Sequence, residues 1–220
     1  MIIDFKAHIM PGMDKTCKSR IDTIRRLMAA KDAGVDLIVA APVYDPDEST
    51  VEEFLERREK SEDILASLMN EELPDVLPAA MVIYRDSLLT AEGLEKLCFG
   101  DKCFLLSMKD AEWDDTTEAV LRRLTGALGM KVILANAGEA VLKHGEKMQQ
   151  LGVHVLLDLD EIHHKKQIRA FLPFIASGLI SALGSDWESE SPYRFLRKAI
   201  RRMDAAFDTV MCASAKLLGK

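Results

Sequence analysis

The sequence lacks the features that mark secreted, membrane-spanning and nucleic-acid-binding proteins. No apolar run among its 220 residues approaches the length of a membrane span. An acidic residue, Asp4, stands where a signal peptide would carry positive charge. The net charge of -7 and the isoelectric point near 5.3 argue against a partner bound through phosphate neutralisation. We therefore expect a cytoplasmic protein with no membrane span and no nucleic-acid partner.

Cysteine and histidine, the usual zinc ligands, are few and scattered. The four cysteines show no paired ligand spacing and stand at Cys17, Cys98, Cys103 and Cys212. Cysteines in a cytoplasmic chain are normally reduced, so we expect them to be small buried or half-exposed side chains. His163 and His164 are adjacent, and neighbouring helical side chains point about 100° apart, which favours a solvated helix start over a metal pair.

Linkers and repeats are also missing. The chain has no low-complexity run, no repeat of fixed period and no Pro/Ser/Gly-rich segment that would separate domains. Hydrophobic residues make up 48% and charged residues 30%, enough to bury one core and to cover it. The basic residues between Arg194 and Arg202 alternate with apolar ones on an expected helix, which favours a solvated outer face. We expect a single domain over residues 1–220.

The segment from Asp4 to Asp14 is the most informative part of the chain. A short apolar strand over residues 2–5 leads to a break at Pro11-Gly12, which leaves Lys6, His8 and Asp14 near the end of the strand. Enzymes built from strands and helices tend to keep their functional groups at such strand ends. The alternatives are a neutral core histidine at position 8 and a helix-capping aspartate at position 14.

Short apolar strands alternate with amphipathic helices along the whole chain. The strands are predicted at residues 2–5, 36–41, 76–84, 103–108, 131–135, 153–159 and 179–184. The helices are predicted at residues 19–33, 50–68, 88–97, 115–128, 138–151, 161–177, 192–203 and 205–217. Seven strands of this kind either close as a βα barrel or lie open as a doubly wound sheet, and periodicity does not separate the two.

Polar side chains follow most of the later strands. They include Tyr84, Arg85, Asp86, Ser107, Lys109, Asp110, Asn136, Asp158, Asp160, Ser185, Asp186 and Glu188. Because the carboxyl ends of parallel strands meet at one edge, we expect these groups to face Lys6, His8 and Asp14. Asp186 is the most specific of them, since a carboxylate beside a buried strand is costly without a partner.

The opening segment DFKAHIMPGMD resembles the start of the PHP superfamily, which runs roughly D-I-H-x-H-I-L-P-G-x-D-D-G in one branch. That branch holds manganese-dependent bacterial protein-tyrosine phosphatases that act on capsule and exopolysaccharide tyrosine kinases. The similarity continues through residues 38–42 and, in order and approximate spacing, through Leu77-Pro78, residues 132–135, Gly152 and Ser185-Asp186. The resemblance implies a closed fold, a distorted seven-stranded TIM-like βα barrel of the PHP type.

The resemblance also implies a set of metal ligands, of which this chain retains His8, Asp14 and Asp186. Glu188 takes the place of the histidine that closes the family's Ser-Asp-Ala-His segment. The family's remaining ligand positions are occupied here by Lys6, Val43, Met81, Ser107 and Asn136, and Glu139 stands where its phosphate-binding arginine would lie.

Lys6 is the most important of these replacements. Its ammonium supplies a fixed positive charge where the family places metal ions, and it repels any cation that enters. We expect Lys6 to form an ion pair with Asp14 or Asp186, and we expect neither a multinuclear metal cluster nor another cofactor.

These departures predict a metal-poor, catalytically degenerate phosphatase homologue that is linked to capsule or exopolysaccharide synthesis. Lys6 and Asp186 are its predicted catalytic residues, and Arg85 and Arg194 its predicted substrate contacts. The predicted partners are a tyrosine-kinase tail, a phosphotyrosine peptide or a second copy of the chain in a homo-oligomer.

Two alternatives stay open. One is an active phosphatase or phosphoesterase that holds manganese or another divalent cation through a reduced site of His8, Asp14, Asp186 and Glu188. The other is a small-molecule binder in which Arg85, Lys109 or Arg194 contacts an anion.

Overall fold

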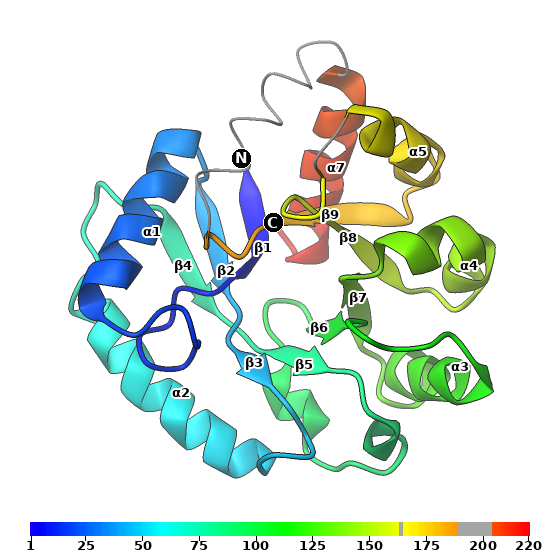
Figure 1. Ribbon diagram of the computed structural model, residues 1–220, viewed down its shortest axis with the longest axis horizontal. Coiled ribbons are helices and arrows are strands. Elements are labelled where there is room, and N and C mark those ends of the chain that lie inside the picture. Colours follow the sequence, from blue (N-terminus) through cyan, green and yellow to red (C-terminus); the bar gives the residue numbers. More distant parts are fainter. Residues whose placement is uncertain (163–164, 189–203) are drawn as a thin grey trace.

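The computed structural model describes residues 1–162, 165–188 and 204–220, and it places the strands at the centre with the helices around them (Figure 1). The first sheet has the order β1 (Ile3–Ala7), β2 (Leu37–Ala40) and β4 (Asp75–Pro78). The second has the order β3 (Val43–Tyr44), β5 (Met81–Ile83), β6 (Cys103–Ser107), β7 (Lys131–Ala135), β8 (His154–Asp158) and β9 (Ile180–Gly184). All strand pairs are parallel, as expected for strands that alternate with helices.

The described residues contain nine strands where seven were predicted: the strand predicted over residues 76–84 is interrupted, and β3 is an additional strand after the one predicted over residues 36–41. Residues 41 and 42 separate β2 from β3, and residues 79 and 80 separate β4 from β5. Backbone hydrogen bonds span both breaks, from Ala79 N to Ala40 O at 2.9 Å and from Met81 N to Pro42 O at 3.0 Å. The chain therefore continues from one sheet into the other at two neighbouring places.

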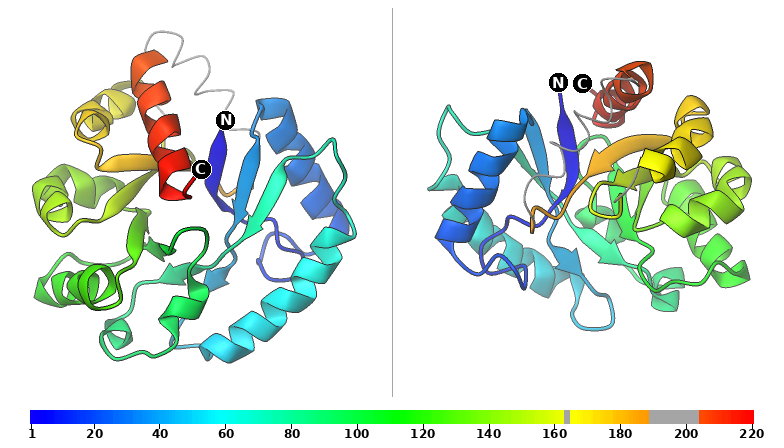
Figure 2. Two further views of the ribbon diagram at one scale, coloured as in Figure 1. Left: turned by 180° about the vertical axis from the view of Figure 1, so that it is seen from behind. Right: turned by 45° about the horizontal axis from the view of Figure 1, so that its top comes forward.

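The first and last strands, β1 and β9, lie side by side in Figures 1 and 2. In the described residues they share no strand ladder, so hydrogen bonds do not close the sheets into a barrel. Gly184 explains how closely the two strands approach: a Cβ atom at this position would lie 2.7 Å from Cβ of Lys6. Ser185 N also reaches Oδ1 of Asp4 at 3.4 Å across the same gap.

The helices follow the strands in the predicted order. They are α1 (Arg20–Ala33), α2 (Val51–Ala66), α3 (Asp115–Arg122), α4 (Gly138–Gln150), α5 (Lys165–Ala176) and α7 (Asp204–Leu217). Capping boxes of Ser19 with Asp22 and of Thr50 with Glu53 begin α1 and α2. A π-helical turn, η3 (Arg123–Ala127), continues α3.

The single helix predicted over residues 88–97 is wrong. Two short 3₁₀ turns occupy this region, η1 (Asp86–Leu89) and η2 (Leu94–Leu97), with Gly93 between them at a φ of 74°. That left-handed conformation ends any continuous helix before η2. The helix predicted near residues 192–203, the basic cluster and the pair His163-His164 lie outside the described residues.

The core has two parts. The larger lies among the sheets and helices, and the smaller contains Ile3, Phe5, Leu105 and Leu156 together with Leu217 of α7. Figure 2 shows α7 running beside β1 and β9, where Ser214 Oγ donates to Ser181 O at 3.0 Å. No helix in the described ranges is long and apolar enough to cross a bilayer.

The four cysteines are free thiols. Cys17 and Cys103 are buried and Cys98 is half-buried, as expected, but Cys212 is exposed. Cys212 lies on α7, whose opposite side packs against the sheet, so this thiol faces solvent.

Candidate functional site

Lys6 of β1 is buried among three carboxylates, and only 1% of its side chain is exposed. Its Nζ atom donates a short hydrogen bond to Oδ2 of Asp158. The same atom lies 2.8 Å from Oδ1 of Asp186 and 3.8 Å from Oδ2 of Asp160. We call these four residues the lysine–aspartate cluster.

The fold brings the three aspartates together because each follows a strand. Asp158 is the last residue of β8, Asp160 lies in the turn after it, and Asp186 follows β9. Asp160 joins the two loops, since its Oδ2 accepts from Asp186 N at 2.6 Å and its Oδ1 from Ser185 Oγ at 3.0 Å. The three carboxylates therefore lie close together at the carboxyl ends of neighbouring parallel strands.

The charges in this cluster depend on each other. Burial lowers the pKa of Lys6, but the charges and hydrogen bonds of Asp158 and Asp186 outweigh burial and raise it above its ordinary value. Burial raises the pKa of Asp158 to about 6, while Lys6 opposes that rise. Burial also raises the pKa of Asp160. At neutral pH the Lys6 ammonium therefore faces an ionised Asp158 carboxylate.

Asp4 connects β1 to the loop that follows β9. Its Oδ1 accepts a hydrogen bond from Lys6 N at 2.9 Å, and its Oδ2 accepts from Nε1 of Trp187 at 2.9 Å. Asp4 and Trp187 are both buried. Asp4 therefore holds in place the two segments that carry Lys6 and Asp186.

His8 and Asp14 form a second pair beside the cluster. Nδ1 of His8 lies 3.1 Å from Oδ1 of Asp14, and Nε2 of His8 lies 3.4 Å from Oδ1 of Asp186. Burial lowers the pKa of His8, but Asp14 and then Asp186 raise it to a net value above the ordinary one. Asp14 does not cap α1, whose cap is Ser19, so that alternative for Asp14 is wrong.

Asn136 links the ends of β6 and β7 to the lysine–aspartate cluster. Its Nδ2 donates to Oδ2 of Asp158 at 2.9 Å and to Oε1 of Glu161 at 3.2 Å, and its Oδ1 accepts from Ser107 Oγ at 3.0 Å. Asn136 has a φ of 53°, the left-handed region that asparagine tolerates better than most residues. Asn136 directly follows β7, and this conformation directs its side-chain amide toward Asp158.

The residues around Lys6 do not fit a cluster of divalent metal ions. In the portion of the chain that the structure describes, no group of three or more His, Cys, Asp or Glu side chains is placed to hold a metal. The Lys6 ammonium lies among the carboxylates that would attract a cation. Glu188 is exposed and its Oε1 accepts a hydrogen bond from Thr16 Oγ1 at 2.7 Å.

The structure places the other predicted site residues away from this cluster or outside the described ranges. The guanidinium of Arg85 is paired with Asp45, with Nη2 at 2.6 Å from Oδ2 and Nε at 3.2 Å from Oδ1. Asp47 lies 3.4 Å from the same Nε. The charge of Arg85 is thus already compensated within the protein, and Arg194 lies outside the described residues.

Asp158 and Asp160 are the two residues of the lysine–aspartate cluster that the sequence prediction missed. Both were recognised as residues at a strand end, but neither was assigned a role. The available signal was an aspartate closing the apolar run of residues 153–157, a position where burial requires a partner. The predicted pairing of Lys6 with Asp186 is confirmed, whereas Asp14 pairs with His8.

Neither family models nor curated protein sequences match the chain. Among solved structures, it is similar to one from the work on YwqE of Bacillus subtilis and CpsB of Streptococcus pneumoniae, described as unique metal-dependent tyrosine phosphatases. The identity is 18%, the TM-score is 0.73, and the match covers 99% of this chain and 94% of that one. The fold is therefore of the CpsB and YwqE type, as the opening segment implied.

A second solved structure is N-isopropylammelide isopropylaminohydrolase from Burkholderia multivorans. Its identity is 14%, its TM-score is 0.43, and the match covers 99% of this chain and 74% of that one. A similarity of this size carries no argument about the site.

Proposed function

We propose that this chain is a PHP-type protein-tyrosine phosphatase homologue that has exchanged its metal site for an internal ammonium and acts as a cytoplasmic binding protein. The observation that carries the proposal is the position of Lys6 Nζ among Asp158, Asp160 and Asp186. The overall fold, which resembles that of metal-dependent tyrosine phosphatases, supports the proposed ancestry and a barrel-like arrangement of the strands.

The chemistry of Lys6 explains why the exchange would abolish hydrolysis. A divalent ion lowers the pKa of a bound water and neutralises charge that develops on a phosphoryl group. A protonated lysine carries one charge, has no open coordination position, and here already donates to carboxylates. Its raised pKa also keeps Lys6 from acting as a general base near neutral pH.

The charges of the lysine–aspartate cluster indicate which partner would bind at this end of the strands. One ammonium faces three carboxylates, so a phosphotyrosine dianion would be repelled. Arg85, the predicted substrate contact, is paired with Asp45. We therefore propose an unphosphorylated tyrosine-containing tail, such as that of a capsule-type tyrosine kinase, as the partner over a phosphotyrosine peptide.

The test compares metal content, turnover and peptide binding in one preparation. The protein is purified in manganese, its metal content is measured, and hydrolysis of an aryl phosphate is assayed with and without added manganese. We expect substoichiometric metal and no turnover above background, together with binding of a tyrosine-rich peptide that weakens when the peptide is phosphorylated. Manganese near one equivalent with turnover that disappears in Asp186→Ala would overturn the proposal.

A reduced metal site is the second candidate, and one observation favours it. Nε2 of His8 and Oδ2 of Asp14 are buried without a hydrogen-bond partner, although nitrogen and carboxylate oxygen are good ligands for manganese. Asp186 lies beside His8, and Glu188 would have to leave Thr16 to join them. Loss of bound manganese and of turnover in His8→Ala would support this candidate.

A further inference from the structure

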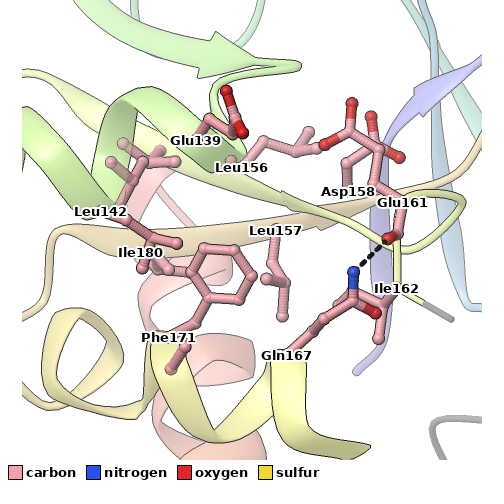
Figure 3. A pocket seen from close by; sticks show the side chains of 14 residues that line it. Glu139, Leu142, Leu156, Leu157, Asp158, Glu161, Ile162, Gln167, Phe171 and Ile180 are labelled. Carbon is pink, nitrogen blue, oxygen red and sulfur yellow. Dashed lines mark hydrogen bonds between the residues drawn. The ribbon is translucent and has the colours of Figure 1, made fainter. Parts of the chain in front are cut away.

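A cavity of about 220 Å³ lies between α4, β8 and α5, on the far side of Asp158 from the first strand. Figure 3 shows Leu142 of α4 and Phe171 of α5 facing this space, with Ile180 of β9 behind them. Apart from its rim the lining is aliphatic or aromatic. A dry apolar cavity of roughly 150 Å³ already accepts a benzene molecule, so this one has room for a single ring with a short side chain.

The rim of the cavity is acidic. Figure 3 shows the carboxylates of Glu139, Asp158 and Glu161 along one edge, and no lysine, arginine or histidine occurs among the described residues of the lining. Asp158 is already paired with Lys6, which leaves Glu139 and Glu161 to receive a ligand. Both are exposed.

Within the described residues, the contacts of the rim give Glu161 no cationic partner and give Glu139 one exposed partner. Glu161 accepts from the neutral amide of Asn136, and its backbone oxygen accepts from Nε2 of Gln167 at 3.4 Å. Among the described residues, the ionic partner of Glu139 is an exposed neighbour on its own helix, Lys143, at 3.7 Å. Gly138 keeps the entrance open between them, since a Cβ atom there would lie 3.2 Å from Oε2 of Glu161.

We propose that this cavity binds a small amphipathic cation, a single ring or short alkyl chain that carries an ammonium group. The apolar part fills the space between Leu142, Phe171 and Ile180, and the ammonium lies between Glu139 and Glu161. Burial of the ring supplies most of the affinity, while the two carboxylates select a cation over a neutral or anionic analogue. The site borders the lysine–aspartate cluster at Asp158, but it does not depend on the proposed function.

Calorimetric titration of the full chain with three matched probes tests the proposal. The probes are phenethylamine, 2-phenylethanol and 3-phenylpropionate, which share a ring and differ in charge. We expect phenethylamine to bind about fivefold more tightly than 2-phenylethanol, the size of effect that an exposed ion pair gives, and 3-phenylpropionate to bind weakest. Equal affinities, preference for the anion, or no saturable binding would overturn the proposal.

Substitutions test the acidic rim and the apolar cavity of the site separately. In Glu139→Gln/Glu161→Gln the advantage of phenethylamine should disappear while 2-phenylethanol binding is retained. Leu142→Trp, at a position that is 49% exposed and tolerates a larger side chain, should fill the cavity and abolish binding of both. Glu146→Gln, an exposed change on the same helix outside the cavity, is the matched control. Unchanged phenethylamine binding in the folded Leu142→Trp variant would place the ligand elsewhere.

Discussion

Nζ of Lys6 lies 2.8 Å from Oδ1 of Asp186, which joins a side chain of the first strand to one that follows the last strand. No strand ladder links β1 to β9 in the described residues, so the contacts of Lys6, Asp4 and Gly184 hold the two strands together. Lys6 is therefore a structural connection between the two strands, and its removal should affect stability.

Lys6→Met should destabilise the protein by about 3–5 kcal/mol, because it leaves the buried carboxylate of Asp158 without its counter-ion. Urea unfolding followed by circular dichroism measures the change. Lys96→Met is the control: Lys96 is exposed and pairs with exposed Glu52 at 2.7 Å, so its removal should cost no more than about 1 kcal/mol. Similar losses in the two variants would show that the cluster does not stabilise the fold.

The same Lys6→Met variant should gain affinity for manganese. Without the ammonium, Asp158, Asp160 and Asp186 remain as neighbouring oxygen ligands, and a bound ion stabilises the folded state. Thermal unfolding should shift upward with manganese in Lys6→Met and stay constant in the wild type. Lys6→Met/Asp186→Asn should lose the shift, and a manganese shift of equal size in the wild type would contradict the exchange of metal for lysine.

Gly184→Ala should destabilise the protein by about 1–3 kcal/mol, since the new methyl group would press on Cβ of Lys6. The contact would lie between the backbone at position 184 and the buried side chain of Lys6, so neither can shift easily to make room for the methyl group. Gly126→Ala serves as the control because nothing lies within 4 Å of its added Cβ. The control should be neutral or slightly stabilising, and the prediction is wrong if both variants unfold at the same urea concentration.

Asn136 combines a positive φ with hydrogen bonds to the cluster, and two substitutions separate these contributions. Asn136→Gly keeps the left-handed backbone and loses the amide contacts, so it should cost about 1–2 kcal/mol. Asn136→Ala adds the strain of a Cβ in that region and should cost about 1 kcal/mol more. Equal unfolding free energies for the two variants would mean that the backbone strain is absent.

The raised pKa of His8 predicts a pH dependence of stability. The folded protein holds this proton more tightly than the unfolded chain, so the contribution is fully present below pH 6.5 and is lost as pH rises through the folded pKa. The stability of the wild type relative to His8→Gln should therefore fall as the pH rises above 6.5. Urea unfolding over this range measures the difference.

His154 provides a control of opposite sign. Burial lowers its pKa, so its neutral form stabilises the fold above pH 6.5 and that stability is lost as the pH falls. The stability of the wild type relative to His154→Gln should rise with pH below 6.5 and stay level above 6.5, where the His8 difference falls. A parallel slope in both comparisons would point to the general charge of the protein instead of these two sites.

The sequence by itself determined the alternation of strands and helices, because apolar runs, capping boxes and breaks are local features. Ser19 with Asp22 and Thr50 with Glu53 begin helices where their patterns predict, and residues 103–107, 131–135 and 180–184 form strands. The opening segment also indicated the correct fold type and the pairing of Lys6 with Asp186.

Only the tertiary structure decided which strand ends meet at Lys6. Asp158 is 152 residues away along the chain, and its partnership with Lys6 depends on the closeness of β1, β8 and β9, which no local pattern encodes. The same holds for the break between β4 and β5, for the additional strand β3 and for the cavity between α4 and α5, which arise from how elements pack. Sequence spacing predicts that charged groups lie at the carboxyl ends of the strands. Which of these groups are buried and paired, and which stay exposed to bind a ligand, depends on the folded chain.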